Sequence, residues 1–424
     1  MGAFAQKLTL LLSDAGLRNR LLFVLGALVV FRALAAIPIP GVNAAQLATF
    51  FNSNQFFGLL NLFSGGGLST LSIVLLGVGP YITASIIMQL LTMMVPSLKA
   101  MYQEEGEAGR IKFAQYSRFL CVPIAVVQAV SLLLVLERQG LLTTLSPFQF
   151  ATNIVVVTAG SVLLMWIGEL ISEYGLGNGV SLLIFAGIVS RLPTQASQLA
   201  FSFDTTQIPT YLAFLVAVFV VIAAVVALNE AERPVEVTYA KRVRGLKFVS
   251  GGGSTYLPLR LNQAGVIPII FALSLILIPQ MFANFFATSH IAILASISAS
   301  IVAAFQNLWL YGTLYFIFVF LFTYFYTATV FDPYQIAENL QKNGAFISGV
   351  RPGEHTAEYL ARIITRITFF GGIFLGVIAV LPIIMQSVTG IQSLALGGTA
   401  LLIVVSVILD LARRIDAQIS IREY

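Results

Sequence analysis

Long uncharged apolar runs dominate this chain and restrict its possible folds more than any other feature. Ten can be counted, and most reach the roughly 20 residues that a helix needs to cross the hydrocarbon core of a bilayer. They lie near residues 21–38, 72–95, 113–136, 150–172, 178–200, 208–229, 263–287, 306–331, 363–386 and 394–412. Hydrophobic residues make up 58% of the sequence and charged residues only 10%. We therefore predict an all-α polytopic membrane protein with ten transmembrane helices.

The positive charges are distributed unevenly between these runs. Of the 23 lysines and arginines, 20 fall before the first run, in every second connecting segment or within the first residues of the run that follows it (Arg118 and Arg366), or at the carboxyl end. Positive residues accumulate on the cytoplasmic side of membrane proteins. We therefore expect both termini and the segments 229–262 and 332–362 to be cytoplasmic. The same pattern requires the fifth run, 178–200, although Arg191 and Pro193 interrupt it.

The connecting segments differ in the local structure that they predict. Segment 229–262 alternates like two strands around glycine-containing turns, which predicts a β-hairpin. Segment 332–362 combines a helical stretch with Gly/Pro turns. The outer segments 38–71, 288–305 and 387–393 carry no charge and are expected to be loops. Ten spans could form two five-helix halves, 1–200 and 201–424, as in many transport proteins, although internal identity is too weak to prove a duplication.

One stretch, Phe56–Val95, suggests a cavity. It begins with a short apolar segment, Phe56–Phe63, and continues through a break at Ser64–Gly67 that we expect to be flexible. The following run, Ser72–Val95, is interrupted by glycines and by Pro80. Non-helical backbone at membrane depth survives only where protein buries it or water bathes it. The stretch therefore predicts a cavity or pore.

The sequence lacks the common signatures of catalysis and of cofactor binding. Neither a P-loop, a strand-linked GxGxxG nor an HExxH motif occurs. The single cysteine, Cys121, excludes an intramolecular disulfide and a multi-cysteine metal site, and we expect it to pack as a small apolar residue. With only two histidines, a histidine metal site is also not expected. We therefore expect no catalytic site, no metal and no cofactor, and hence not an enzyme.

An ion-coupled secondary transporter of a small solute is the alternative function. Such carriers place ionisable residues deep in their spans, but here Asp and Glu cluster at span ends and Arg32 is the only deep charge. The polar groups inside the spans are instead amides and hydroxyls, and they include Ser85, Gln128, Asn262 and Ser274. Such groups usually hydrogen-bond neighbouring helices. Where several meet between two helices, they would form a contact weak enough to open.

Several passages carry a family resemblance. They include LNLFSGGGLSTLSIVLLGVGPYITASIIMQLLT at 60–92, WIGELISEYGLGNGVSLLIFAGIV at 166–189 and GAFISGVRPGEHTAEYL at 344–360. These and others resemble the SecY family, the central channel subunits of the bacterial protein-conducting Sec translocon, in the same order along nearly the whole chain. The resemblance implies a ten-helix hourglass of two pseudo-symmetric five-helix halves around a central pore, clamped by SecE and flanked by SecG. Unfolded polypeptide would cross through the centre, or leave sideways into lipid between spans two/three and seven/eight.

The resemblance also assigns roles to individual residues. The pore ring maps to Val78, Ile82, Val180, Ile184, Ile270 and Ile403. The plug is a short helix and its glycine hinge at about 57–71, with Phe57, Leu60, Asn61, Phe63, Ser64, Gly65, Gly66, Gly67 and Leu68. The lateral gate would involve Gln128, Asn262 and, less directly, Ser85. A ring of stiff apolar side chains resists wetting and so obstructs ions.

The expected partners follow from the same resemblance. The cytoplasmic residues Lys241, Arg242, Arg244, Lys247 and Arg351 match surfaces used by the SecA ATPase and the ribosome. Basic clusters suit ribosomal RNA phosphates. Signal sequences and nascent polypeptides would be the substrates, and the bacterial cytoplasmic membrane would be the location. A hydrophobic signal sequence could replace gate contacts and so shift the population toward the open state.

Overall fold

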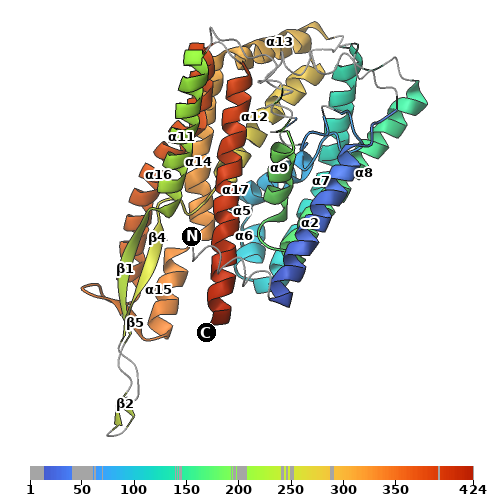
Figure 1. Ribbon diagram of the computed structural model, residues 1–424. Coiled ribbons are helices and arrows are strands. Elements are labelled where there is room, and N and C mark those ends of the chain that lie inside the picture. The colour runs from blue at the N-terminus through green and yellow to red at the C-terminus, as the bar shows by residue number, and fades with distance from the viewer. Residues whose placement is uncertain are drawn as a thin grey trace. The chain divides into compact units, whose positions relative to one another are not determined.

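The structure, a computed structural model, is mostly helical (Figure 1). It describes residues 14–40, 61, 64–68, 70–138, 140, 142, 146–191, 193, 197, 208–239, 243–244, 247–248, 253–286, 291–389 and 392–423. A helix lies in each of the ten predicted ranges. The chain forms two compact units, the first comprising Met1–Leu215, Leu273–Tyr311 and Pro382–Tyr424, and the second Val216–Ala272 and Gly312–Leu381. The predicted division into repeat-related halves at residue 200 stays a prediction.

The first unit contains most of the helices. They are α2 (Ala15–Ala35), α5 (Gly79–Met94), α6 (Pro96–Gln103), α7 (Gly106–Arg138), α8 (Pro147–Tyr174), α9 (Gly179–Val189), α13 (Ala292–Gln306), α17 (Gln392–Glu423) and the second part of α12 (Ile267–Phe286). Helix α8 is central, because it contacts α2, α5, α7 and α9, and α9 in turn contacts α17. Fully buried leucine and isoleucine side chains, such as Leu133, Leu164 and Ile171, form the core of this unit.

Side-chain caps and prolines fix where several helices begin. The Asp14 carboxylate accepts hydrogen bonds from the backbone N–H groups of Gly16 and Leu17, at 2.7 and 3.2 Å, and starts α2. Ser146 and Gln149 form a reciprocal capping box ahead of α8, which has a proline in its first turn. Helix α5 also has a proline, Pro80, in its first turn. These local signals place each helix start independently of hydropathy.

Four helices in the described residues are individually long and apolar enough to cross a membrane. They are α7, α8, α14 (Leu308–Val330) and α16 (Glu354–Thr389). Helices α5 and α6 together form a fifth candidate that bends by 114° at the break between them. Several other helices in the predicted ranges are shorter, including α9, whose described helix ends at Val189. The remainder of the predicted span 178–200 lies largely outside the described residues.

Two predicted segments differ from the structure. The run at 72–95 is not helical throughout: residues 73–78 form consecutive turns, and α5 begins only at Gly79. This backbone is buried by α8, where a Cβ added to Gly160 would overlap the carbonyl oxygen of Ile73. The segment 288–305, expected to be a loop, contains the 15-residue helix α13. It lacks charges because it is an apolar helix, but one too short to span a bilayer alone.

The second unit combines helices with a small antiparallel sheet. Its elements are most of α11 (Ile208–Glu230), β1 (Glu232–Tyr239), β4 (Ser254–Arg260), the start of α12, α14, α15 (Pro333–Lys342), β5 (Ala345–Ile347) and most of α16. The predicted hairpin is confirmed, since β1 pairs with β4 and Val235 lies opposite Leu257. Between them, the short strands β2 (Val243–Arg244) and β3 (Lys247–Phe248) also pair.

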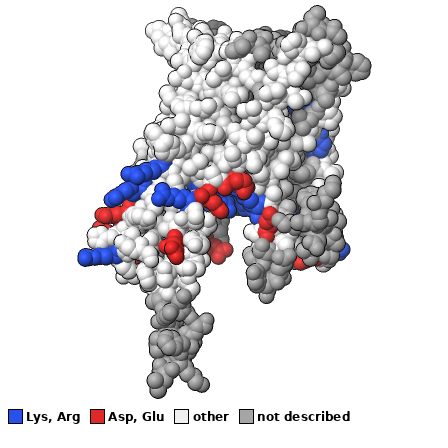
Figure 2. All heavy atoms as spheres, turned by 60° about the vertical axis from the view of Figure 1, so that its left-hand side comes forward, with Lys and Arg blue, Asp and Glu red and all other residues white. Residues whose placement is uncertain are grey.

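The sheet packs on the first part of α16. Strand β5 joins the free edge of β1, with Val237 opposite Ile347, a pairing that the sequence pattern did not predict. Val235, Val237 and Ile347 are buried in one cluster with Leu360 and Ile364. In Figure 2, most charged side chains gather in one zone of the surface. The charged residues of this unit lie mainly in the sheet, in α15 and in the first part of α16, whereas α14 and α16 beyond Arg366 carry none. The unit therefore has one polar end and one end suited to lipid.

Candidate functional site

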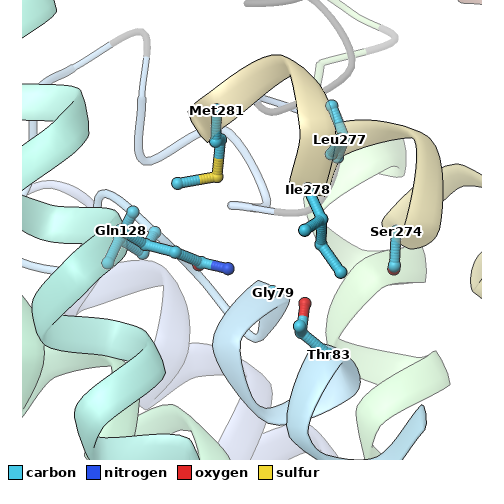
Figure 3. Close-up of a pocket in the computed structure, with 8 residues that line it drawn as sticks. Gly79, Thr83, Gln128, Ser274, Leu277, Ile278 and Met281 are labelled. Carbon is cyan, nitrogen blue, oxygen red and sulfur yellow. The ribbon is translucent and has the colours of Figure 1, made fainter. Parts of the chain in front are cut away.

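A small cavity lies between α5, α7 and α12, all within the first unit (Figure 3). It has about 380 Å³ of empty space, part of which is open to the surroundings. Its lining combines polar and apolar groups: Leu76, Gly79, Thr83, Gln128, Ser274, Leu277, Ile278 and Met281. Figure 3 shows the Gln128 side chain reaching from α7 toward the start of α5, with α12 on the opposite side. Three helices thus meet around a partly polar space.

A hydrogen bond joins α7 to α12 beside this cavity. The Ser131 hydroxyl donates to the carbonyl oxygen of Met281 at 3.2 Å, and Ser131 is buried. Ser131 lies three residues after Gln128, so both side chains are on one face of α7. Hydroxyl-to-carbonyl bonds between membrane helices are worth only about 0.6–2 kcal/mol. The contact between these helices is therefore specific but weak.

The three residues predicted for the lateral gate occupy different environments. Gln128 lines the cavity. Ser85 is half-buried on α5 and is not among the residues that line the cavity. Asn262 belongs to the second unit, where its amide donates to the side chain of Asn229 at 3.0 Å. The gate assignment as a set therefore stays a prediction.

Thr83, Ser131 and Met281 are cavity or seam residues that sequence reasoning missed. Thr83 lies four residues after Gly79, and both line the cavity. Helical spacing would have found Thr83 once the helix start at Gly79 was known, because residues four apart share a face. Ser85 is two residues further on and hence on a different face. The missing information was the helix start, which apolar composition alone did not give.

An ion pair between α7 and α8, with a hydrogen bond from Tyr81 on α5, joins three helices one turn before Ser85. The Arg118 guanidinium lies 2.8 Å from the Glu169 carboxylate, measured from Nε to Oε1. The Tyr81 hydroxyl donates to the same carboxylate oxygen at 3.4 Å. Glu169 is the less exposed partner, with 17% of its side chain exposed against 43% for Arg118. This cluster anchors the residue that immediately precedes Ile82.

The described residues of the predicted plug form a compact turn. We call Ser64–Leu68 the glycine turn. All five of its residues are buried, as is Asn61. The N–H of Gly66 donates to the Asn61 carbonyl at 3.0 Å, and the Leu68 N–H donates to the Ser64 hydroxyl at 3.0 Å. Phe57, Leu60 and Phe63 lie outside the described residues.

The chain after the glycine turn is joined to the end of α2. The N–H of Ile39 donates to the Leu71 carbonyl at 2.8 Å, and that of Ile73 donates to the Ile37 carbonyl at 2.9 Å. The Thr70 hydroxyl also donates to the Ala35 carbonyl at 2.8 Å. Leu71 has a positive φ of 42°, which is unusual for a leucine. The non-helical backbone at residues 70–73 is therefore bonded to the end of α2 and to the residues that follow it.

Five of the six predicted ring residues belong to the first unit. Val78 and Ile82 are buried one turn apart at the start of α5. Val180 and Ile184 are one turn apart on α9, and Ile403 is buried on α17, a helix that contacts α9. Ile270 is buried on the part of α12 that belongs to the second unit. The ring as a whole stays a prediction.

The predicted partner-binding residues are described only in part. Lys241 and Arg242 lie outside the described residues. Arg244 and Lys247 face each other in the register of β2 and β3. Arg351 is exposed between β5 and α16, and its carbonyl accepts a hydrogen bond from the buried Thr356 hydroxyl at 2.8 Å. That bond fixes the backbone while the arginine side chain faces outward.

The described part of the chain contains no group of three or more His, Cys, Asp or Glu side chains that could hold a metal ion. Cys121 is buried against Ala84 and Met165, as expected for a small apolar residue. The chemistry available at the cavity is thus that of neutral hydrogen-bonding groups and apolar side chains. Such a site suits reversible contact between helices or with an apolar segment.

Comparisons with known proteins agree on one family. A family model described as SecY matches residues 72–412. The protein translocase subunit SecY of Mycobacterium leprae is 41% identical over 437 residues, covering 97% of both chains. The corresponding subunit of Synechocystis is 39% identical over 417 residues, covering 97% of this chain and 94% of that one.

Solved structures show the same fold. One, described as a protein conducting channel, aligns with a TM-score of 0.64 at 20% identity, covering 94% of this chain and 91% of the other. Another, from work on the plug domain of SecY, aligns with a TM-score of 0.63 at 21% identity over the same shares. With the sequence relatives, these matches establish a multi-pass membrane protein, and the chain belongs to the SecY family.

Proposed function

We propose that this chain is a protein-conducting channel, through which unfolded secretory polypeptides cross the membrane and membrane-protein segments leave sideways into lipid. The observation that carries the proposal is the largely buried non-helical backbone of residues 64–68 and 71–78, which includes Val78 and ends one helical turn before Ile82. Irregular backbone among membrane helices occurs where it lines a cavity or is buried by protein. Because the chain belongs to the SecY family, we infer that an unfolded polypeptide passes through this cavity.

The cavity between α5, α7 and α12 is the proposed lateral gate. Helices α5 and α7 correspond to the second and third predicted spans, and α12 to the seventh. A neutral hydrogen bond between Ser131 and Met281 joins α7 and α12 there. An apolar signal segment entering this seam would replace that weak contact with apolar burial. The gate would then open in proportion to the hydrophobicity of the segment.

The proposed partners and location rest on the family resemblance and on charge. SecE and SecG would accompany the chain in a bacterial cytoplasmic membrane, with both termini in the cytoplasm. SecA or a translating ribosome would supply the driving force at Arg351 and at the hairpin between β1 and β4. A solved Sec61 channel in a canine ribosome complex has the same fold, with a TM-score of 0.60 at 19% identity.

Reconstitution tests this function against the alternative of an ion-coupled transporter. The full chain with its membrane subunits, in liposomes, should take up an unfolded secretory polypeptide only when SecA and ATP, or a translating ribosome, are present. The matched control is the same polypeptide without its signal sequence, which should stay outside. Uptake of a small solute driven by an ion gradient, without polypeptide transport, would overturn the proposal.

A further inference from the structure

The glycine turn contacts α9 backbone to backbone. A Cβ added to Gly187 on α9 would overlap the Cα of Gly65 and lie 2.9 Å from its carbonyl carbon. Real Cβ atoms do not make such contacts, so any larger residue at 187 must displace the turn. Gly65 itself has a φ of +61°, and a Cβ there would overlap the ring of Phe31 on α2. Both glycines are therefore required by close approach.

Two arginines cover the next residue of the turn. A Cβ added to Gly66 would lie 3.3 Å from the Nε atom of Arg191 and 3.5 Å from an Nη atom of Arg32. Arg32 comes from α2 and Arg191 follows the end of α9. Their charges repel each other. The segment 38–71 contains no acidic residue, so a carboxylate of that segment does not explain why two cations converge there.

The turn presents backbone groups that suit these cations. Its internal hydrogen bonds make it one connected piece: Gly67 donates to the Ser64 carbonyl at 3.1 Å, and Ser72 donates to the Gly67 carbonyl at 2.8 Å. Gly65 and Gly66 both have positive φ angles, so their backbone does not continue a helix. A guanidinium carries five N–H donors in a planar fork and can serve the carbonyl groups of such a turn.

We propose that Phe31, Arg32, Gly187 and Arg191 form a docking seat that positions the glycine turn in the resting channel. The inference deepens the proposed function, on which it rests, because that function makes the turn part of the plug. Gly187 and Phe31 determine how closely α9 and α2 approach Gly65, and the two arginines contact the turn at Gly66. These glycines serve as a contact surface in the resting channel, in addition to any freedom that they give the chain when it moves.

Cysteine labelling tests where the turn lies. In the full complex carrying Cys121→Ala, Leu68→Cys places the only thiol of this subunit on a fully buried position of the turn. A membrane-impermeant maleimide should label it slowly. Adding Gly187→Ala should raise the labelling rate about tenfold, because overpacking weakens the docked state. Arg191→Gln should raise it severalfold, and Arg191→Lys should restore part of the protection.

Matched controls separate positioning from general damage. Gly109→Ala introduces a similar clash in the same unit, with the Met101 carbonyl, and Gly26→Ala meets nothing within 4 Å. Both should leave the labelling rate unchanged. A labelling rate at or below the reference in Gly187→Ala and Arg191→Gln overturns the proposal, as does an equal rise in Gly109→Ala. If Gly187→Ala does not accumulate, Arg191→Gln decides, because it adds no atom to the contact with the backbone.

The labelling result is independent of the proposed function. It is measured on the resting complex without substrate, whereas polypeptide uptake by the unaltered complex is measured separately. If Leu68→Cys is labelled slowly but the unaltered complex never takes up polypeptide, the proposed function is refuted and the proposed docking seat stands. If polypeptide uptake is normal but Gly187→Ala leaves the labelling rate of Leu68→Cys unchanged, only the proposed docking seat is refuted.

Discussion

Ser131 donates its hydroxyl hydrogen to the carbonyl oxygen of Met281, and this bond crosses from α7 to α12. Both residues belong to the same compact unit, and both lie at the seam beside the partly polar cavity. The bond uses a carbonyl on α12, a helix that contains Pro279. A proline in a helix lacks an N–H and leaves a carbonyl one turn earlier without its usual donor. Here that carbonyl is the one of Leu275, so Pro279 weakens α12 within the turn that precedes the seam.

Ser131→Ala should loosen this seam. Loss of one neutral hydrogen bond between membrane helices is worth about 0.6 kcal/mol, or roughly a threefold shift toward the open gate. Export of a secretory protein with a weakened signal sequence should therefore rise by about that factor, measured as the processed fraction after a short pulse. Ser300→Ala, which removes an exposed bond to Ser296 within α13, is the control. Equal export by both variants would contradict this role for Ser131.

The sequence predicts the helices and the hairpin well because both follow from periodicity and charge. Each of the ten runs contains a helix, and β1 and β4 pair as the alternating pattern requires. It does not predict where α5 begins. Residues 72–78 are as apolar as the helix that follows, and composition cannot distinguish buried turns from a span. The glycines of the run 64–67 predict a hinge, which stays a prediction, and the sequence does not show that each of them is in close contact with another part of the chain.

Other features depend on contacts between distant parts of the chain. Strand β5 has only three residues, Ala345–Ile347, so it carries too little pattern to be recognised before β1 is known to have a free edge. The approach of Gly187 to Gly65 likewise joins segments more than a hundred residues apart. Thr83 and Ser131 are ordinary polar residues until the helices that face them are placed. Sequence reasoning recovered Gln128 because an amide in an apolar span is unusual by itself.

Ile403→Asn should weaken the proposed ring. Ile403 is buried on α17, and an asparagine there places a polar amide in an apolar environment and favours wetting of the constriction. We expect higher ion leakage through the resting channel in planar bilayers and increased export of a protein with a defective signal. Ile403→Val, which keeps an apolar branched side chain, should behave like the unaltered channel.

The exposed Ile408 provides the second control for the ring. It lies on the same helix, so Ile408→Asn makes the same chemical change outside the core. This variant should not raise the resting conductance. If Ile408→Asn leaks as much as Ile403→Asn, the effect belongs to the helix as a whole, and the assignment of Ile403 to the ring is wrong.

Gly371→Ala should destabilise the second unit. A Cβ at this position would overlap the carbonyl oxygen of Leu261, the residue that joins β4 to Asn262. Backbone cannot move aside cheaply, so we expect a cost of about 1–3 kcal/mol and a lower midpoint of thermal unfolding in detergent. Gly26→Ala, in open space within α2, should be neutral or stabilising by up to about 1 kcal/mol. An equal midpoint in both variants would contradict the tight packing at Gly371.

Arg351→Glu should impair export driven by a cytoplasmic partner without affecting folding. The Arg351 side chain is exposed, whereas its carbonyl is fixed by the buried hydroxyl of Thr356 at 2.8 Å. Reversing the charge therefore changes the surface offered to SecA or to RNA phosphates but keeps the backbone that carries it. We expect SecA-dependent transport into vesicles to fall at least severalfold, with an unchanged midpoint of thermal unfolding. Arg362→Glu, an equal charge change at an exposed position of α16, is the control. Normal SecA-driven transport by Arg351→Glu, or an equal loss in Arg362→Glu, would show that Arg351 makes no specific contact with the partner.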